Sequence, residues 1–457
     1  MLSLDDTIAA VSTAMGEGGI GIVRLSGPAA EAILSSTFAP SGRPSGSTLE
    51  SHRFYYGHVV APDCDVPVDE ALAVLMRAPR TYTRQDVAEV HCHGGIVPLR
   101  RTLGLMLSLG ARLAEPGEFT LRAFLNGRID LAQAEAVVDI VRAKTDVGLR
   151  VAVEQLDGGI SDRVRHIRSA LVQALASVEA SLDFPEDEIP PLDLAAVFEG
   201  AEEKINALLA RSGEGMVYRQ GVRTAIVGRP NVGKSSLLNA LLRTSRAIVT
   251  PVPGTTRDTL EETLTLRGIP LCLVDTAGIT ESIDLVEKLG VERSRQALQR
   301  ADLVLMVVDG SERLQKEDAQ IAALLSNRMT IVVVNKIDLR ATADDGRILP
   351  QARRVRVSAL TGEGLDLLED AIVETVFSGQ VETSHLPLVS NPRHCDILRR
   401  ALSQVMAAAE SHRSRADSAD LVAVDLAAAI GALGEITGET VSEDVLTAIF
   451  STFCVGK

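Results

Sequence analysis

One short segment near the middle of the chain constrains its fold more than any other. Residues 224–227 are mostly apolar, residues 228–235 read G-R-P-N-V-G-K-S, and apolar residues at helical spacing follow from Ser236. This order predicts a strand, a glycine-rich loop and a helix, and the loop matches the phosphate-binding pattern G-x-x-x-x-G-K-[ST]. An ordinary glycine-rich turn is the alternative for such a loop taken alone.

A loop of this kind binds nucleotide phosphates for physical reasons. Glycines let backbone N–H groups approach the phosphate oxygens, and the N-terminus of the next helix attracts the anion. We expect Lys234 to neutralise charge on the β- and γ-phosphates and the Ser235 hydroxyl to ligate Mg²⁺. The segment therefore predicts a nucleotide-binding α/β domain.

A second motif indicates which base the bound nucleotide carries. Residues 335–338 read N-K-I-D directly after the apolar run 331–334, so they are expected at the carboxyl end of a strand, where open α/β sheets bind ligands. The Asp338 carboxylate can accept hydrogen bonds from guanine N1–H and the exocyclic amine, a pair that adenine does not present. GTP is therefore the expected nucleotide.

Three more elements occur in the expected order. Residues 275–278 (D-T-A-G) are expected near Mg²⁺ and the γ-phosphate, Thr256 in the switch 254–258 is expected on Mg²⁺, and residues 358–360 are expected to close over guanine. The residues that these motifs assign to GTP binding are Asn231, Val232, Gly233, Lys234, Ser235, Ser236, Gly254, Thr255, Thr256, Asp275, Thr276, Ala277, Gly278, Asn335, Lys336, Asp338, Ser358, Ala359 and Leu360.

The residue after Gly278 bears on hydrolysis. Many GTPases carry a water-orienting glutamine there, but this chain has Ile279, which can neither orient nor deprotonate water. Another group must position the nucleophile, and the downstream candidates are Glu281, Asp284 and Glu287. A solvated loop charge is the alternative for each of them.

Composition limits the remaining function classes. The 457 residues include no apolar run of the ~18 needed to cross a bilayer, and the acidic start lacks a signal sequence, so we expect no membrane association and a cytoplasmic protein. Five cysteines without a C-x-x-C pair argue against a disulfide framework, and His91-Cys92-His93 alone does not favour zinc. With a net charge of −15, any RNA partner needs a local basic patch.

Changes of pattern along the chain predict its organisation. Short strand-like runs at 20–23, 54–60 and 71–76 indicate an α+β domain over residues 1–120. Helical periodicity then predicts a helical domain in two parts, 121–217 and 380–457, interrupted by an inserted P-loop GTPase α/β domain over 218–379. Residues 184–191 are expected to form a linker or bend.

Motifs from end to end resemble one known family. They are the P-loop 228–236, the switch 254–258, the segment P-G-E-F-T-L-R-A-F-L-N-G at 116–127 and the terminal F-C-V-G-K at 453–457. Together they are similar to the MnmE (TrmE) tRNA-modification GTPase family. The resemblance implies a potassium-activated GTPase that forms a homodimer and a heterotetrameric complex with the FAD-dependent MnmG protein. It implies addition of a carboxymethylaminomethyl-type group to the wobble uridine of certain tRNAs, with 5-formyl- or methylene-tetrahydrofolate bound in a folate-binding and dimerisation domain at the N-terminus.

The resemblance also implies roles for single residues. Potassium ligands are expected at Asn231, Thr250, Val252 and Thr255, and Pro251 and Pro253 join the GTP-binding set with Thr250 and Val252. Glu287 aligns with the family's catalytic glutamate, and Cys454 is a candidate for nucleophilic or redox chemistry. Folate contacts are expected at Arg24, Glu89, Arg128 and Lys457.

Some positions depart from the family pattern. The usual T-G-E-D is here Thr83-Arg84-Gln85-Asp86, Arg128 replaces a common Lys, and Val455 replaces Ile. Without the tail motif, Cys454 would be interpreted as a small buried hydrophobe. The alternative for the whole chain is a GTP-switched ribosome-assembly or scaffolding protein, whose N-terminal domain would bind no folate.

Overall fold

The structure forms two compact units. The computed structural model describes residues 5–43, 47–61, 64–184, 192–244, 262–274, 298–340, 348–377, 389–414 and 419–457. The first unit comprises Met1–Val138, Leu156–Arg168 and Ile430–Lys457, and the second comprises Asp139–Gln155 and Ser169–Ala429. No helix in the described ranges has the length and apolar character needed to cross a membrane.

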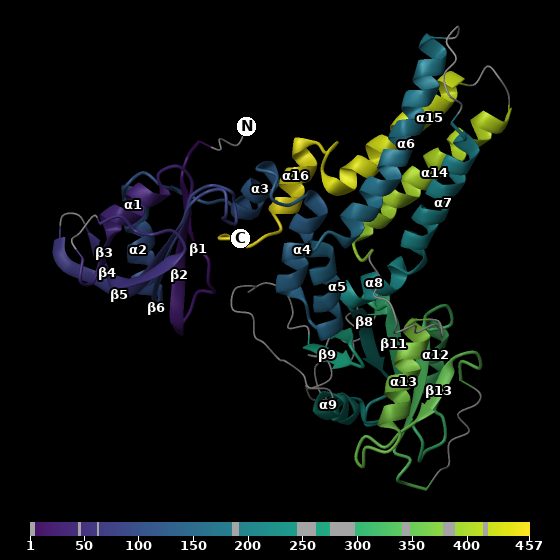
Figure 1. Ribbon diagram of the computed structural model, residues 1–457. Coiled ribbons are helices and arrows are strands. Elements are labelled where there is room, and N and C mark those ends of the chain that lie inside the picture. The colour runs from purple at the N-terminus through teal and green to yellow at the C-terminus, as the bar shows by residue number, and fades with distance from the viewer. Residues whose placement is uncertain are drawn as a thin grey trace. The chain divides into compact units, whose positions relative to one another are not determined.

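A seven-stranded sheet dominates the first unit (Figure 1). Its order is β3-β4-β5-β6-β2-β1-β7, and neighbours are antiparallel except for β1 and β7. The strands are β1 (Ile8–Val11), β2 (Gly18–Ser26), β3 (Phe38–Pro40), β4 (Arg53–Ala61), β5 (Cys64–Met76), β6 (Val87–Gly94) and β7 (Arg112–Leu113). The strands predicted at 20–23, 54–60 and 71–76 are confirmed within β2, β4 and β5.

Two helices cover one face of this sheet, α1 (Ala30–Thr37) and α2 (Ile96–Ser108). A Cβ on Gly21 would lie 2.6 Å from Leu99 Cδ1, so this glycine allows α2 to approach the sheet. Because side chains alternate along a strand, Val23 and Val90 point into the buried core, whereas Arg24 and Glu89 lie on the opposite face. The fold thus presents Arg24 and Glu89 on the face away from α1 and α2.

Helices from three parts of the chain complete the first unit. They are α3 (Glu118–Leu125), parts of α4 (Leu131–Arg142), α6 (Gly159–Asp183) and α15 (Ala419–Thr437), and α16 (Glu443–Phe450). A separate apolar cluster joins α3, α4 and α16, and its buried members include Leu121, Leu131, Phe450 and Phe453. The C-terminal segment is therefore packed as part of the N-terminal unit.

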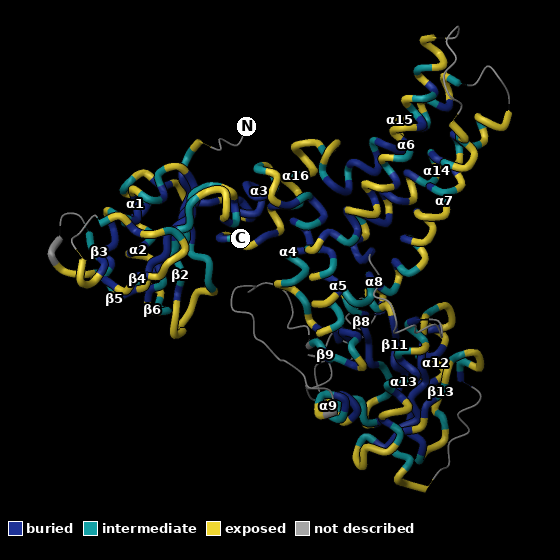
Figure 2. Tube along the Cα trace, in the orientation of Figure 1, coloured by how far each residue is buried: buried dark blue, intermediate teal, exposed yellow. Residues whose placement is uncertain are grey.

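The second unit contains a six-stranded sheet of order β13-β12-β11-β8-β10-β9, in which β9 alone of the described strands is antiparallel to its neighbour. The strands are β8 (Val222–Val227), β9 (Glu262–Leu266), β10 (Ile269–Leu273), β11 (Leu303–Asp309), β12 (Thr330–Asn335) and β13 (Arg353–Arg356). Every residue of β11 and β12 is buried (Figure 2), as expected of central parallel strands.

Helices lie on both faces of this sheet. α9 (Lys234–Thr244) and α13 (Leu365–Val376) share a core with Leu305 and Val307, whereas α12 (Lys316–Leu324) shares a core with Val304 and Met306. Successive residues of β11 therefore point to opposite layers. The order of the strands reverses at β8, because β10 lies on one side of it and β11 on the other, and such sheets bind ligands at this position.

The remaining helices of the second unit are α5 (Asp146–Leu156), α7 (Leu194–Ala210), α8 (Ser212–Gln220) and α14 (Pro392–Ser414). α7 precedes the six-stranded sheet in sequence and α14 follows it, yet the two helices pack against each other (Figure 1). This is the arrangement expected when an α/β domain is inserted into a helical one, and it confirms the predicted fold class. The boundaries at 120, 217 and 379 stay predictions, and most of the predicted linker 184–191 lies outside the described residues.

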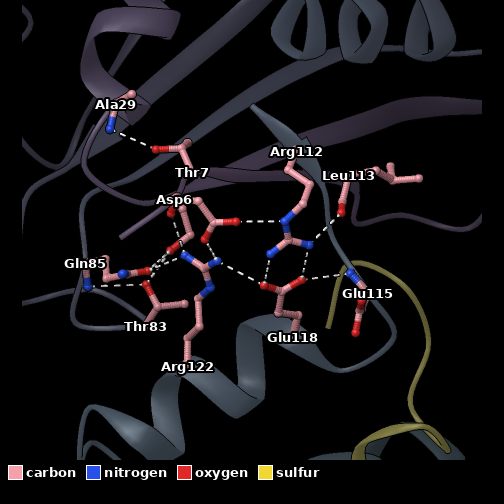
Figure 3. A network of polar contacts seen from close by, with 11 residues as sticks. Asp6, Thr7, Ala29, Thr83, Gln85, Arg112, Leu113, Glu115, Glu118 and Arg122 are labelled. Carbon is pink, nitrogen blue, oxygen red and sulfur yellow. Dashed lines mark hydrogen bonds and ion pairs between the residues drawn. The ribbon is translucent and has the colours of Figure 1, made fainter. Parts of the chain in front are cut away.

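A buried network of charges seats α3 against the first sheet (Figure 3). Glu118 Oε1 accepts hydrogen bonds from Arg112 Nη2 at 2.6 Å and from Arg122 Nη2 at 2.9 Å. Asp6 pairs with both arginines, at 2.7 Å and 2.5 Å. Glu118 is 2% exposed and Arg122 is 1% exposed, so neither charge is solvated by water and each depends on the other.

The network lowers the pKa values of its two carboxyl groups, Glu118 and Asp6. Burial alone would raise the pKa of Glu118, but hydrogen bonds from Arg112, the Glu115 backbone and Arg122 outweigh it and lower the pKa. The pKa of Asp6 is lowered in the same way, against burial, by Arg112 and Arg122. A carboxyl group whose pKa is lower in the folded than in the unfolded state stabilises the fold at pH values above its unfolded-state pKa. This contribution is lost as the pH falls through the folded-state pKa.

We expect Glu118→Gln to destabilise the first unit by about 3 kcal/mol at pH 7, because it removes the buried one of the two carboxylates that compensate the charge of buried Arg122 and leaves Asp6 as its remaining acidic partner. Its unfolding midpoint should also change less than the wild type's between pH 6 and about pH 4, because one titrating carboxylate is gone. Urea unfolding followed by tyrosine fluorescence measures this, since Tyr55, Tyr56 and Tyr82 of the chain's 4 tyrosines lie in this unit.

Glu50→Gln is the matched control. Glu50 pairs with Arg53, but the two side chains are 63% and 59% exposed, so its removal should change stability by well under 1 kcal/mol. Equal midpoints for Glu118→Gln and the wild type at pH 7 would show that the network does not stabilise the unit.

Candidate functional site

The phosphate-binding loop follows β8 and depends on two glycines. A Cβ on Gly228 would lie 2.3 Å from the carbonyl oxygen of Val307, and a Cβ on Gly233 would lie 2.2 Å from Asn335 Nδ2. Their φ angles are 154° and 98°, outside the range that other residues readily adopt. The loop backbone therefore lies against β11 and β12 with no room for side chains at these positions.

Lys234, the first residue of α9, places its ammonium group inside the loop. Its Nζ donates to the carbonyl oxygens of Gly228 at 3.0 Å and Arg229 at 2.8 Å. Burial lowers the pKa of Lys234. The positive charge is thus held by backbone oxygens beside the loop, where an anion would compensate it better than neutral carbonyls do.

Asn335, the last residue of β12, connects two of the predicted motifs. Its Nδ2 donates to the carbonyl oxygen of Val232 at 2.9 Å, and its Oδ1 accepts from the backbone N–H of Ala359 at 3.0 Å. In the same loop, Ser358 Oγ donates to Asp338 Oδ1 at 2.5 Å. The structure therefore brings the phosphate loop, N-K-I-D and residues 358–360 together, as the sequence predicts.

Two ion pairs that no sequence motif predicted support this site. Lys336, at a φ of 65°, donates to Asp309 Oδ2 at 2.5 Å, and Arg229 Nε donates to Asp318 Oδ2 at 2.8 Å. Asp309 ends β11, so a charged residue directly after the apolar run 303–308 was the available signal. Nothing comparable in the sequence marks Asp318.

Several predicted residues lie outside the described residues. They are Thr250, Pro251, Val252, Pro253, Gly254, Thr255, Thr256, Asp275, Thr276, Ala277, Gly278 and Glu287, and also the alternatives Glu281 and Asp284. Ser235 and Ser236 begin α9 next to Lys234, and Leu360 is 86% exposed at the tip of its loop.

A second cluster lies on the face of the first unit's sheet opposite α1 and α2. Arg24 on β2 is paired in register with Glu89 on β6, and its Nε donates to Glu89 Oε1 at 2.8 Å. His91 Nε2 lies 3.1 Å from Glu89 Oε2. The hydrogen bond with His91, together with Arg24, lowers the pKa of Glu89 against the opposing effect of burial. Glu89 is therefore held ionised between two donors.

The C-terminal tail docks beside this cluster (Figure 1). Pro116 and Val455 form an antiparallel bridge, and the carbonyl oxygen of Cys454 accepts from Gly117 N–H at 3.4 Å. Gly456 has a φ of 92°, and a Cβ there would lie 2.4 Å from the carbonyl oxygen of Val11. Its own carbonyl oxygen accepts from Arg24 Nη1 at 3.4 Å. The tail is thus fixed against β1 and β2.

The remaining predicted residues are less tightly grouped. The Arg128 guanidinium lies 4.8 Å from the centre of the Tyr82 ring, and Tyr82 packs beside Phe119, over which Arg24 lies at 5.7 Å. Lys457 follows Gly456 and is partly buried. Cys454 is exposed, so its interpretation as a buried hydrophobe is wrong.

His91 was considered in the sequence only as a possible zinc ligand, and its pairing with Glu89 was missed. His93 pairs instead with Asp69, at 2.7 Å between Nδ1 and Oδ1. Across the part of the chain that the structure describes, no three His, Cys, Asp or Glu side chains group so as to hold a metal ion. Alternation along β6 would have placed residues 89 and 91 on one face, which was the available signal.

Comparisons with known proteins match both units. The model of the MnmE helical domain matches residues 131–454, and the model of the GTP-binding protein TrmE N-terminus matches residues 7–128. The tRNA modification GTPase MnmE of Roseiflexus castenholzii is 51% identical, and the match covers 99% of each chain. That of Chloroflexus aurantiacus is 52% identical over 99% of this chain and 100% of its own length.

A solved structure, the G domain of the FeoB iron transporter of T. maritima, is 29% identical over 34% of this chain and 98% of that chain, with a TM-score of 0.25. The match of the helical-domain model to more than half of the chain, together with full-length relatives at about 50% identity, shows the family. The chain belongs to the MnmE (TrmE) family of tRNA modification GTPases.

Proposed function

We propose that this protein is a potassium-activated GTPase that modifies tRNA. Acting with the FAD-dependent MnmG protein, it adds a carboxymethylaminomethyl-type group at C5 of the wobble uridine, using the one-carbon unit of 5-formyl- or methylene-tetrahydrofolate. Family membership and the name shared by the relatives support this proposal. The observation that carries it is Asn335, whose side chain bonds both the phosphate loop and the loop at 358–360.

The described residues fit a guanine nucleotide. Lys234 would bind the phosphates, because among the described residues its partly buried ammonium donates to neutral carbonyls, and Asp338 would accept from the base. Ser235 would ligate Mg²⁺ with Thr256. GTP supplies the phosphoanhydride bond that water cleaves, with Mg²⁺ neutralising charge. Because Ile279 replaces the usual glutamine, we assign orientation of the water to Glu287.

Potassium is proposed to bind at Asn231, with Thr250, Val252 and Thr255. Asn231 is exposed and has a φ of 65° between the two glycines of the loop, and its amide oxygen is a suitable ligand for a monovalent cation. A cation there would stabilise charge on the leaving phosphates, the role that an arginine finger has in other GTPases.

We expect Asn231→Ala to abolish the stimulation of GTP hydrolysis by K⁺ over Na⁺ and to lower turnover in K⁺ by roughly 10-fold or more, because the lost contact acts mainly in the transition state. Steady-state hydrolysis in matched K⁺ and Na⁺ buffers measures it. Asn206→Ala, on the exposed side of α7, is the matched control and should keep the K⁺ stimulation. Equal rates of the wild type in both salts would contradict the proposal.

The folate is proposed to bind at the cluster of Arg24, Glu89, Arg128 and Lys457. The Glu89 carboxylate has about four lone-pair positions, of which Arg24 and His91 use two, so it can still accept from the N–H edge of a pterin. The bound folate would supply a one-carbon unit. Arg24 would orient it, and Cys454, whose thiol is exposed on the docked tail, is proposed as the nucleophile.

We also propose a cytoplasmic homodimer that joins MnmG in a heterotetrameric complex and binds tRNA. The alternative, a ribosome-assembly or scaffolding GTPase, needs neither the Arg24–Glu89 cluster nor an exposed cysteine on an ordered tail. No observation favours that alternative.

Mass analysis of tRNA wobble uridines tests the proposed function. Cells that lack the gene should lose the modified uridine, and the wild-type gene should restore it. We expect Cys454→Ser to hydrolyse GTP like the wild type but to restore less than about 1% of the modification, because a hydroxyl is a far weaker nucleophile than a thiolate. Ser451→Ala, also exposed near the tail, is the matched control. Normal modified uridine in the deletion strain would favour the alternative function, and full rescue by Cys454→Ser would show that the thiol takes no part.

A further inference from the structure

A strained arginine lies beside the proposed folate site. Arg84 has a φ of 57°, in the left-handed region that costs a residue with a side chain roughly 1 kcal/mol and costs glycine nothing. The usual family pattern T-G-E-D has glycine where this chain has Arg84. A strained backbone conformation at a residue with a side chain suggests that this side chain has a functional role.

The contacts of Arg84 fix where its charge lies. Its Nη1 donates to the carbonyl oxygen of Asn126 at 2.9 Å and lies 3.5 Å from the position of a Cβ on Gly127. In return, Asn126 Nδ2 donates to the carbonyl oxygen of Thr83 at 2.7 Å. These reciprocal hydrogen bonds hold the loop at 83–84 against the turn that ends α3. The Arg84 guanidinium therefore lies beside the backbone that leads into Arg128.

Arg84 and Arg128 form an uncompensated pair of cations. Both residues are exposed, and neither makes an ion pair with any carboxylate among the described residues. Arg84 uses one of its five N–H donors on Asn126, and Arg128 contacts the face of Tyr82. In a chain with a net charge of −15, two neighbouring arginines without acidic partners mark a local anion-binding surface.

This surface is continuous with the cluster around Glu89. Arg128 lies over Tyr82, Tyr82 packs against the apolar cluster that contains the buried Phe119, and Arg24 lies over Phe119 while bonded to Glu89. The Glu89 carboxylate, which accepts from N–H groups, thus lies at one end of this series of contacts. The cations Arg84 and Arg128 lie at the other end. A reduced folate has the same polarity, with a pterin that donates N–H groups at one end and glutamate carboxylates at the other.

We propose that Arg84 and Arg128 bind the carboxylates of a γ-linked glutamyl chain, so that this protein prefers a polyglutamylated folate. The inference rests on the proposed function, because it requires that a folate binds at Glu89. Arg128 alone suffices for the first glutamate, and Arg84 extends the anion site to the next one. RNA phosphates are the competing anion for the same pair of arginines.

Calorimetry with two ligands tests the preference. The full-length wild type should bind the γ-linked triglutamate of 5-formyl-tetrahydrofolate about 5-fold more tightly than the monoglutamate, as expected for exposed ion pairs, and added salt should reduce the difference. In Arg84→Gly the two affinities should become equal. Arg84→Lys keeps the charge and should keep most of the preference.

Two controls separate binding from folding. Arg84→Gly relieves the positive φ but loses the hydrogen bond to Asn126, so the two effects offset each other and its thermal midpoint should stay close to that of the wild type. Arg100→Gln removes an exposed arginine from α2 of the same unit and should retain the wild-type preference. Glu89→Gln should weaken both ligands, by roughly 30-fold or more, because a buried charge-assisted contact is lost.

The outcomes distinguish the two proposals. If neither ligand binds the wild type, the proposed folate function fails. If the monoglutamate binds and the triglutamate binds no more tightly, or if Arg84→Gly keeps the preference, only the present inference fails. A loss of tRNA affinity in Arg84→Gly without any change in the preference would assign the two arginines to RNA and overturn it.

Discussion

The ion pair between Glu118 and Arg122 is the contact on which the architecture around the proposed folate site depends. Both side chains are almost completely buried, and Glu118 also accepts from the backbone N–H of Glu115 at 2.9 Å, which fixes the turn before α3. That turn presents Gly117 and Pro116 to the tail, and the tail in turn presents Gly456 to Arg24. The charge network thus supports, through this turn, the position of the tail beside Arg24.

The nucleotide site is organised on the same principle. Asn335 connects segments that are about 100 residues apart in sequence, since its two amide atoms bond Val232 and Ala359. Both partners are backbone groups, so the position of Asn335 fixes two loops without depending on the side chains of either. Polar contacts between segments distant in sequence thus shape both sites, through Arg122 with Asp6 in the first unit and through Asn335 with Val232 in the second, and both contacts form without a ligand.

The sequence predicted those parts of the structure that local patterns determine. The glycine-rich loop after β8, N-K-I-D after β12 and three of the seven strands of the first sheet, β2, β4 and β5, were found because apolar patterns and glycine spacing report burial and backbone conformation directly. Contacts between distant segments were not found in this way. The pairing of Glu89 with Arg24, the support of Lys336 by Asp309 and the docking of the tail all depend on strand register or tertiary packing, which no local pattern specifies. Arg84 was noticed as a departure from a family pattern, and its φ of 57° came only from the structure.

Hydrogen exchange of the full-length protein, resolved by mass spectrometry, tests the central claim that the buried network holds the tail on the N-terminal sheet. The account predicts that peptides covering 115–118 and 453–457 exchange at least ~10-fold more slowly than an unstructured chain and that Glu118→Gln accelerates both together. Glu50→Gln should leave both unchanged. Exchange of 453–457 at the unstructured rate in the wild type, or slow exchange that persists in Glu118→Gln, would contradict the account.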